Sequence, residues 1–248
     1  MKINTSKKRI CIQTIIMIVS VTTVIVSCFA ARILGASSEQ SYIAHGGGAV
    51  DGNMRTNSLE AVEHAISKGV KYIELDLQQT CDGRLVAAHD WCTFNQLTGR
   101  DTLSDRVPAY NEFKACRILG RYKPMTYETI DSVFSSNSDI ILVTDKIKDI
   151  EVLDKFIGQL KDRMLVECFS RKQYDDCIRL GYTPMRSYHN FIPGGLNVVK
   201  AGCARYIYQQ LIPVTYAIFD NRIITAHDAD SIFAADSRVR FVYVDEFD

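Results

Sequence analysis

Strand-like and helix-like stretches alternate along this chain from residue 39 to its end, and this alternation constrains the fold more than any other feature. The strand-like stretches are short runs rich in branched and aromatic residues. The helix-like stretches repeat apolar residues at spacings of three and four, which gives a helix one apolar face. The predicted strands are Tyr42–Gly46, Tyr72–Gln78, Ile140–Asp145, Met164–Phe169, Thr183–Ser187, Arg205–Tyr208, Arg222–Ala226 and Phe241–Asp245, and the predicted helices include Ser58–Lys68, Thr126–Ser135, Ile150–Lys161 and Arg171–Leu180.

This pattern predicts an α/β domain of the (β/α)8 TIM-barrel class over residues 39–248. Eight strands separated by helices can close into a ring of parallel strands with the helices outside. A doubly wound open sheet uses the same alternation, and counting strands does not separate the two folds. Asn57 is expected to cap the first helix, because its side chain can accept from the free N–H groups of the first turn.

One strand-like stretch, Leu85–His89, breaks the alternation. It follows Tyr72–Gln78 after a connection too short for a parallel crossover, which needs about a dozen residues. We therefore expect an antiparallel β-hairpin turned at Asp82-Gly83, as an excursion after the second strand. Folding back about this turn is predicted to bring His89 opposite Glu74.

Glu74 and Asp76 lie two positions apart on an otherwise apolar predicted strand. Side chains two apart on a strand share a face, so both carboxylates point the same way. Two bare anions are costly to bury inside a barrel, and a hard divalent cation such as Mg²⁺ or Ca²⁺ offsets that cost. The alternative is that both acids face solvent. The hairpin that carries His89 toward this strand favours the metal interpretation.

His45 ends the first predicted strand and is followed by Gly46, Gly47 and Gly48. Glycines let the backbone approach a ligand closely, and successive backbone N–H groups can form an anion-binding nest. The histidines, the acids and the glycine run are all expected at the C-terminal mouth of the barrel, where the active sites of barrel enzymes lie. The sequence therefore predicts a catalytic site at this mouth.

An apolar stretch, Ile10–Ala31, precedes the domain. It contains no charged residue and follows the basic cluster Lys7-Lys8-Arg9. As a helix it is about 33 Å long, which matches the hydrocarbon core of a bilayer and exceeds the apolar part of most cleaved signal peptides. Residues 1–38 are thus predicted to be a cytoplasmic basic tip, a single transmembrane helix and a linker, which places the domain on the far side of the membrane.

Two other outcomes stay open for this N-terminus. Cleavage near Ala30-Ala31 would release a secreted protein. The run Ile25-Val26-Ser27-Cys28 resembles a bacterial lipobox, which would make Cys28 a lipidated N-terminus. Retention of the first residues in the membrane fraction distinguishes an uncleaved anchor from both, and Cys28→Ser releases the protein only if that residue carries lipid.

The composition narrows the class of partner. Lys plus Arg and Asp plus Glu are 29 each, so the net charge is zero and no basic excess can hold a nucleic-acid backbone. The chain has 8 cysteines without a C-x-x-C pair. Cys168, Cys177 and Cys203 lie in apolar stretches and are predicted to be buried structural residues.

Five short motifs resemble those of the glycerophosphodiester phosphodiesterase family in order and spacing. They occupy the first third of the domain and correspond to the family's HRG, ENT, ELD, T-x-DG and HD motifs: His45-Gly46-Gly47, Asn57-Ser58-Leu59-Glu60-Ala61, Glu74-Leu75-Asp76-Leu77, Thr80-x-Asp82-Gly83 and Val86-x-x-His89-Asp90. Later segments resemble the family more loosely, in the strand that supplies a third acidic ligand and in the closing strand: Leu142-Val143-Thr144-Asp145 and Tyr243-Val244-Asp245.

The resemblance implies a barrel with the hairpin as an excursion and a hydrolase of lipid-derived or small-molecule phosphodiesters. It implies His45 and His89 as the catalytic pair, with Glu74, Asp76 and Asp145 as ligands of a divalent metal. One histidine would activate the attacking oxygen and the other would protonate the leaving alkoxide. Which histidine takes which part, and whether the metal is Mg²⁺ or Ca²⁺, stay open.

Three departures from the family pattern affect the expected substrate contacts. Gly46 stands where the family has an arginine, Thr56 replaces the glutamate of the ENT motif, and the acid-x-lysine triplet appears as Asp145-Lys146-Ile147-Lys148. Substrate contacts are predicted at five positions, of which Arg186 could restore the lost positive charge: Gly46, Gly47, Lys146, Glu167 and Arg186. For Glu167 and Arg186 an ordinary surface salt bridge is the slightly favoured alternative.

Two other functions are compatible with the same residues. A phospholipase-D-like lyase would transfer the phosphate to an internal hydroxyl and give a cyclic product. A catalytically inactive barrel could serve as a surface binding module, although a dead site has no need of intact His45, Glu74, Asp76 and His89.

Overall fold

A computed structural model of the chain describes residues 40–100, 105–187, 216–218, 223–235 and 239–247. The chain divides into two units, Met1–Glu39 and Gln40–Asp248, and the described residues all belong to the second. The predicted anchor Ile10–Ala31 lies outside the described residues, so it stays a prediction. Within the residues described, no helix combines the length and the apolar character needed to cross a membrane.

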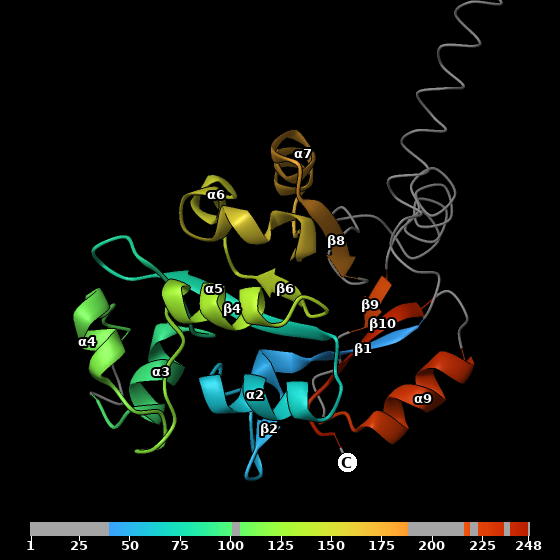
Figure 1. Ribbon diagram of the computed structural model, residues 1–248, viewed down its shortest axis with the longest axis horizontal. Helices are drawn as coiled ribbons and strands as arrows, with labels where there is room; N and C mark the ends of the chain where they lie inside the picture. The colour runs from blue at the N-terminus through green and yellow to red at the C-terminus, as the bar shows by residue number, and fades with distance from the viewer. Residues whose placement is uncertain (1–39, 101–104, 188–215, 219–222, 236–238, 248) are drawn as a thin grey trace, which may run out of the picture. The chain divides into compact units, whose positions relative to one another are not determined.

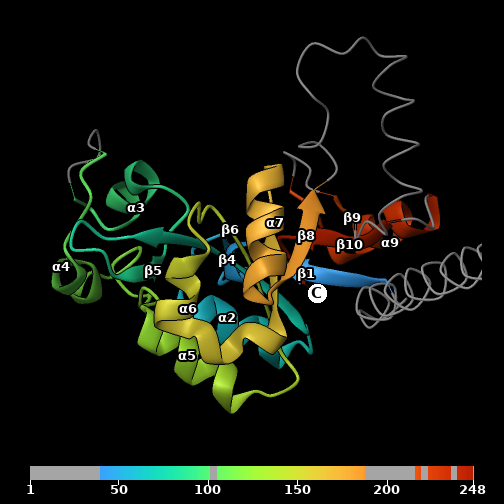
Figure 2. The same ribbon diagram turned by 90° about the horizontal axis from the view of Figure 1, so that it is seen from above.

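A curled parallel sheet forms the centre of the domain (Figures 1 and 2). Strand β1 is hydrogen-bonded to β4 on one side and to β10 on the other, so the order of strands returns on itself. An open doubly wound sheet does not do this, and the α/β class with a curled parallel sheet is confirmed. The parallel strands in the described residues are β1 Ser41–Ala44, β4 Tyr72–Gln79, β6 Ile141–Asp145, β7 Met164–Glu167, β8 Thr183–Ser187, β9 Tyr216–Ile218 and β10 Val239–Val244.

The second half of the sheet differs from the prediction at two places. The predicted strand Arg205–Tyr208 lies outside the described residues. The predicted strand Arg222–Ala226 is wrong over its described residues, 223–226, because helix α9 begins at Ala226 and only Thr225 among them makes an isolated bridge, to Glu246. Strand β9 instead provides the neighbour of β10. Two apolar residues, Ile223 and Ile224, made this short connection resemble a strand.

The predicted hairpin is confirmed, with a different register. Strand β5, Leu85–Ala87, pairs antiparallel with the end of β4, and Leu77 lies opposite Ala87. The turn spans Thr80–Arg84, closed by hydrogen bonds from the N–H of Thr80 to the carbonyl of Arg84 and from that of Gly83 to the carbonyl of Thr80. The register is therefore one residue off the expectation that His89 lies opposite Glu74. Helices α3, Trp91–Leu97, and α4, Tyr110–Ala115, follow on this side (Figure 2).

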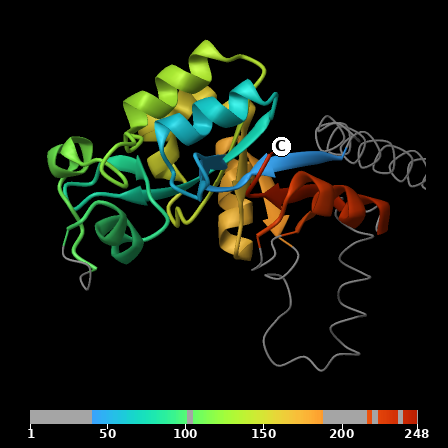
Figure 3. The same cartoon turned by 90° about the horizontal axis from the view of Figure 1, so that it is seen from below.

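Amphipathic helices lie outside the sheet, and short polar residues begin three of them. Ser58, Thr126 and Ser170 each accept a hydrogen bond from an N–H of the first helical turn. The first helix is therefore capped by Ser58 and not by Asn57 as predicted. Figure 3 shows α2 and α5 on one side of the strands. The outer helices are α2 Leu59–Ser67, α5 Tyr127–Ser136, α6 Glu151–Ile157, α7 Arg171–Leu180 and α9 Ala226–Ala235, with 3₁₀ turns at His45–Gly47 and Gly158–Arg163.

Two apolar layers hold the sheet. The larger one fills the space between the strands and the outer helices and includes Cys168 and Cys177, which are buried as predicted, with their sulfur atoms 3.5 Å apart. The smaller one lies on the opposite face of the strands, where a residue from each of several strands meets the others: Ile43, Tyr72, Val143, Leu165, Met185, Phe241 and Tyr243. The inner face of the curled sheet is therefore packed and not open.

Candidate functional site

The inner face of the sheet changes from apolar to polar toward the C-terminal ends of the strands. Residues two apart on a strand share a face, so the residue two positions after each inner apolar residue also faces inward. After five of the inner apolar residues this position carries an ionisable side chain, and Asp76 lies two positions further along the strand of Glu74. All of these side chains are buried or nearly so: His45 after Ile43, Glu74 after Tyr72, Asp145 after Val143, Glu167 after Leu165 and Asp245 after Tyr243. One layer of the domain therefore concentrates the polar chemistry.

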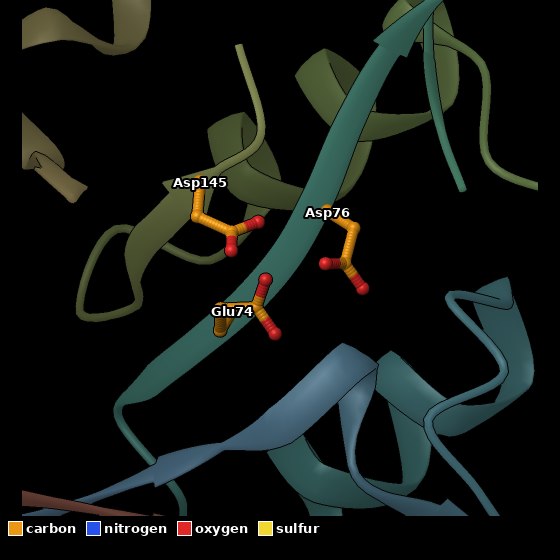
Figure 4. Close-up of side chains that lie close together, drawn as sticks. All are labelled: Glu74, Asp76 and Asp145. Atoms are coloured by element: carbon orange, nitrogen blue, oxygen red, sulfur yellow. The ribbon is translucent and has the colours of Figure 1, made fainter. Parts of the chain in front are cut away.

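Three carboxylates of this layer turn toward one another (Figure 4). Glu74 and Asp76 come from β4, and Asp145 comes from the end of the neighbouring strand β6, opposite Asp76 in the parallel register. One oxygen from each carboxylate lies within 4.8 Å of the others. The structure brings together the three residues that the sequence predicted as metal ligands.

Two oxygens of this cluster are buried without a partner. Glu74 Oε2 accepts a hydrogen bond of 2.6 Å from the backbone N–H of Gly46. Among the described residues, Glu74 Oε1 and Asp145 Oδ1 have no hydrogen-bond partner. An unsatisfied buried oxygen with a negative charge costs several kcal/mol, on the order of the penalty for burying an unpaired ion. Both atoms can therefore accept a cation.

The electrostatics of the cluster favour the binding of a cation. Burial raises the pKa of Glu74 well above its ordinary value, and the carboxylates of Asp76 and Asp145 raise it further. Burial, and then the charge of Asp76, raises the pKa of Asp145 to about 8. Oxygen donors of this kind fit a hard divalent cation such as Mg²⁺ or Ca²⁺, which would relieve both effects.

Asn57 and Lys146 hold the cluster from two sides. Asn57 donates from its side-chain nitrogen to Asp76 Oδ2 and accepts from the backbone N–H of Asp76, both at 2.9 Å. The ammonium of Lys146 lies 3.5 Å from Asp145 and 3.8 Å from Asp76. Both residues have a left-handed backbone, with φ of 53° and 59°, which non-glycine residues seldom adopt and which functional sites often retain.

His45 is buried beside this cluster and is fixed by two further residues. Its Nδ1 lies 3.0 Å from Asp245 Oδ1. Arg55 binds the same carboxylate in a bidentate manner, at 2.6 Å from Nε and 2.9 Å from Nη2. Sequence reasoning gave no role to Arg55 or Asp245. The parity of the closing strand, which places Asp245 two residues after Tyr243, was the signal that could have found the aspartate.

His89 follows strand β5 and is more exposed than His45. Its Nδ1 lies 2.6 Å from Asp90 Oδ2, and its side chain is 47% exposed. Gln78 of β4 donates to the backbone carbonyl of His89 at 3.0 Å and ties the residue to the strand that carries the acids. The two histidines therefore follow β1 and β5, both of which are hydrogen-bonded to β4.

The residues predicted to contact the substrate differ in their burial and in their hydrogen-bond partners. The N–H of Gly46 is directed at Glu74, so it positions a carboxylate instead of forming part of an anion-binding nest. Glu167 is buried and accepts from the hydroxyl of Tyr243 at 2.6 Å, so the surface salt bridge considered for it is wrong. Gly47 is buried with a φ of 86°. Arg186 is placed on β8 by its backbone pairing with Tyr216, and its side chain is outside the described part.

Known proteins resemble this chain in sequence family and in fold. A family model described as the glycerophosphoryl diester phosphodiesterase family matches residues 47–177. None of the curated proteins matches this chain in sequence. Solved structures match over most of the chain at identities that demonstrate the fold alone.

Three of these structures show the extent of the likeness. A glycerophosphodiester phosphodiesterase from Parabacteroides distasonis is 19% identical, with 84% of this chain and 93% of that chain covered and a TM-score of 0.57. An Oleispira antarctica phosphodiesterase in complex with the product sn-glycerol-3-phosphate is 17% identical, with 84% and 93% covered and a TM-score of 0.58. A glycerophosphodiester phosphodiesterase from Thermotoga maritima is 20% identical, with 77% and 88% covered and a TM-score of 0.54.

The close approach at Gly46 gives a testable prediction. A Cβ atom built at Gly46 would lie 2.7 Å from the Cα of Arg55, whereas one at Gly52 would meet nothing within 4 Å, and both glycines have a positive φ. Gly52→Ala should cost about 1 kcal/mol of unfolding free energy for the left-handed backbone alone. Gly46→Ala should cost about 1–3 kcal/mol more, because the backbones must separate. Chemical denaturation of both variants measures the difference, and equal losses would contradict the contact.

Proposed function

We propose that this chain cleaves a glycerophosphodiester or a related lipid-derived substrate with the help of one divalent cation. The chain belongs to the glycerophosphoryl diester phosphodiesterase family and is therefore a phosphoric diester hydrolase. One observation supports the metal above all others: three buried carboxylates within 4.8 Å, two of which carry an unpartnered oxygen. The product sn-glycerol-3-phosphate in the Oleispira antarctica phosphodiesterase supports the substrate class.

The proposed ligands are Glu74, Asp76 and Asp145. A bound Mg²⁺ or Ca²⁺ supplies Lewis-acid polarisation of the phosphoryl oxygens and offsets the charge that develops there. The chain's own residues keep the ligands in place, since Gly46 fixes one oxygen of Glu74 and Asn57 fixes Asp76. Lys146, whose ammonium lies beside the cluster, is proposed to attract a phosphoryl oxygen.

The proposed acid–base pair is His45 and His89. One histidine takes the proton of the attacking oxygen, and the other gives a proton to the leaving alkoxide, whose basicity makes unassisted departure slow. Each imidazole has a carboxylate on its Nδ1, Asp245 for His45 and Asp90 for His89, which stabilises the ring when it gains a proton. Both rings are therefore suited to proton transfer through Nε2.

The N-terminal segment adds a proposal about location. Ile10–Ala31 is apolar, uncharged and of bilayer length, and a basic cluster precedes it. We infer that it anchors the domain at the outer face of a cell membrane, where lipid-derived phosphodiesters are available. Cleavage to a secreted form and lipidation at Cys28 are the outcomes that would replace this inference.

The metal claim is tested with Glu74→Gln in the full chain, purified in detergent. Chelation should abolish hydrolysis by the wild type, and added Mg²⁺ or Ca²⁺ should raise its melting temperature, because a ligand bound only by the native state stabilises it. Glu74→Gln should lose both effects, and its metal-free form should melt higher than the metal-free wild type, since like charges no longer repel. Glu151→Gln, a charge loss at an exposed salt bridge to Arg179, is the matched control and should behave as wild type. Full wild-type activity in excess chelator would refute the proposed dependence of hydrolysis on a metal.

The histidine pair is tested by His45→Ala and His89→Ala. Each should lower turnover by about 10²–10⁴-fold, the usual contribution of a positioned acid or base. His64→Ala, on the exposed face of α2, controls for the loss of an imidazole and should leave turnover unchanged. Turnover is followed with glycerophosphodiesters by phosphorus NMR, which also separates an open phosphomonoester from the cyclic product of a lyase. Undiminished turnover in either variant would remove that histidine from the mechanism.

A further inference from the structure

The carboxylate of Asp245 receives hydrogen bonds from every direction. Oδ1 lies 3.0 Å from His45 Nδ1 and accepts from Arg55 Nε at 2.6 Å. Oδ2 accepts from Arg55 Nη2 at 2.9 Å and from the backbone N–H of Ile224 at 3.0 Å. The side chain is only 1% exposed, so water does not compete with these contacts. Four donor atoms therefore hold both oxygens of this carboxylate in place.

This carboxylate stays ionised despite its burial. Burial alone would raise the pKa of Asp245. The hydrogen bonds from His45, Arg55 and the Ile224 N–H have a larger, opposite effect and hold that pKa well below its usual value. An ionised carboxylate has no proton to donate. The proton between the two side chains must therefore be on His45 Nδ1, and the neutral ring carries its lone pair on Nε2.

We propose that Asp245, braced by Arg55, is the positioning residue that fixes the tautomer and orientation of His45. The inference rests on the proposed function for its catalytic meaning, while the tautomer itself is independent of any substrate. Arg55 contributes by geometry: its planar fork meets both oxygens of the carboxylate, which sets the plane of Asp245 relative to the imidazole ring. Tyr243 packs its ring edge-on against the same imidazole, with centroids 5.4 Å apart, and limits its rotation.

The His89–Asp90 pair shows by contrast what is particular to His45. Asp90 is 42% exposed, and the same residue caps helix α3 by accepting from the N–H of Thr93 at 2.7 Å. Water can reach both members of that pair, and no arginine is bound to Asp90 among the described residues. Its effect on the ring is thus screened, whereas the buried Asp245 acts in a low dielectric.

Asp245→Asn tests the proposal because an amide cannot satisfy its neighbours. All four atoms that face the carboxylate of residue 245 are N–H donors, and the NH₂ of an asparagine must turn toward some of them. Where it turns toward His45, it can only donate to Nδ1, and the ring proton moves to Nε2. Nitrogen-15 NMR of the histidine rings reports this directly: in the wild type, neutral His45 should carry its proton on Nδ1, and in Asp245→Asn it should carry it on Nε2 to a large extent.

Turnover supplies the second readout. Asp245→Asn should lower kcat by about 10²-fold or more with KM changed less than about threefold, because substrate binding does not use this residue. The rise in melting temperature on adding Mg²⁺ should persist, since the metal ligands are intact. Arg55→Met, which leaves the carboxylate bonded to His45 and Ile224, should keep the Nδ1–H tautomer and lose less of kcat.

The controls separate this inference from its premise. Asp154→Asn removes a carboxylate that accepts from Tyr182 and Lys161 and should change neither the His45 signal nor kcat. A wild type without hydrolytic activity but with an Nδ1–H His45 would refute the proposed function and leave the positioning role. A wild type whose His45 carries its proton on Nε2, or an Asp245→Asn variant with wild-type kcat, would overturn the positioning role of Asp245. The proposed hydrolase function would be unaffected by either result.

Discussion

Like charges buried at close range are the constraint on which the rest of this structure depends. Glu74, Asp76 and Asp145 lie within 4.8 Å of one another in the interior of the curled sheet. Burial and the neighbouring carboxylates raise the pKa of Glu74 and of Asp145, and two oxygens of the cluster have no partner among the described residues. The surrounding residues partly offset this charge. The backbone N–H of Gly46 donates to Glu74, the side chain of Asn57 donates to Asp76, and the ammonium of Lys146 lies beside Asp145.

The strand period explains why much of this site could be predicted from the sequence. Glu74 and Asp76 had to share a face, and the pairing of β4 with β6 then places Asp145 opposite Asp76. The hairpin could be predicted because a short connection forbids a parallel crossover. Its register could not, because β4 continues one residue beyond the predicted strand and Gln79, not Gln78, pairs with Leu85. The strand expected at Arg222–Ala226 failed for a similar reason, since a short apolar run does not distinguish a strand from a buried connection.

Some of the contacts that the sequence did not predict join residues far apart in the chain. Asp245 reaches His45 and Arg55 only because β10 closes the sheet against β1. Gly46 stands where an arginine was expected from the family resemblance, and the structure shows the consequence: without a side chain at this position, the backbone of Arg55 lies against it and its guanidinium reaches Asp245. Asn57 was expected to cap a helix, but its left-handed backbone turns its amide to Asp76 and leaves the cap to Ser58.

Anomalous diffraction from crystals of the full chain grown with Mn²⁺ tests whether the three carboxylates bind a single cation. Mn²⁺ accepts the same oxygen ligands as Mg²⁺ and scatters anomalously. We expect one peak at about 2.2 Å from an oxygen of each of Glu74, Asp76 and Asp145, with the ammonium of Lys146 outside the coordination shell. Absence of a peak there at saturating Mn²⁺, with Lys146 bound between the carboxylates in its place, would contradict it.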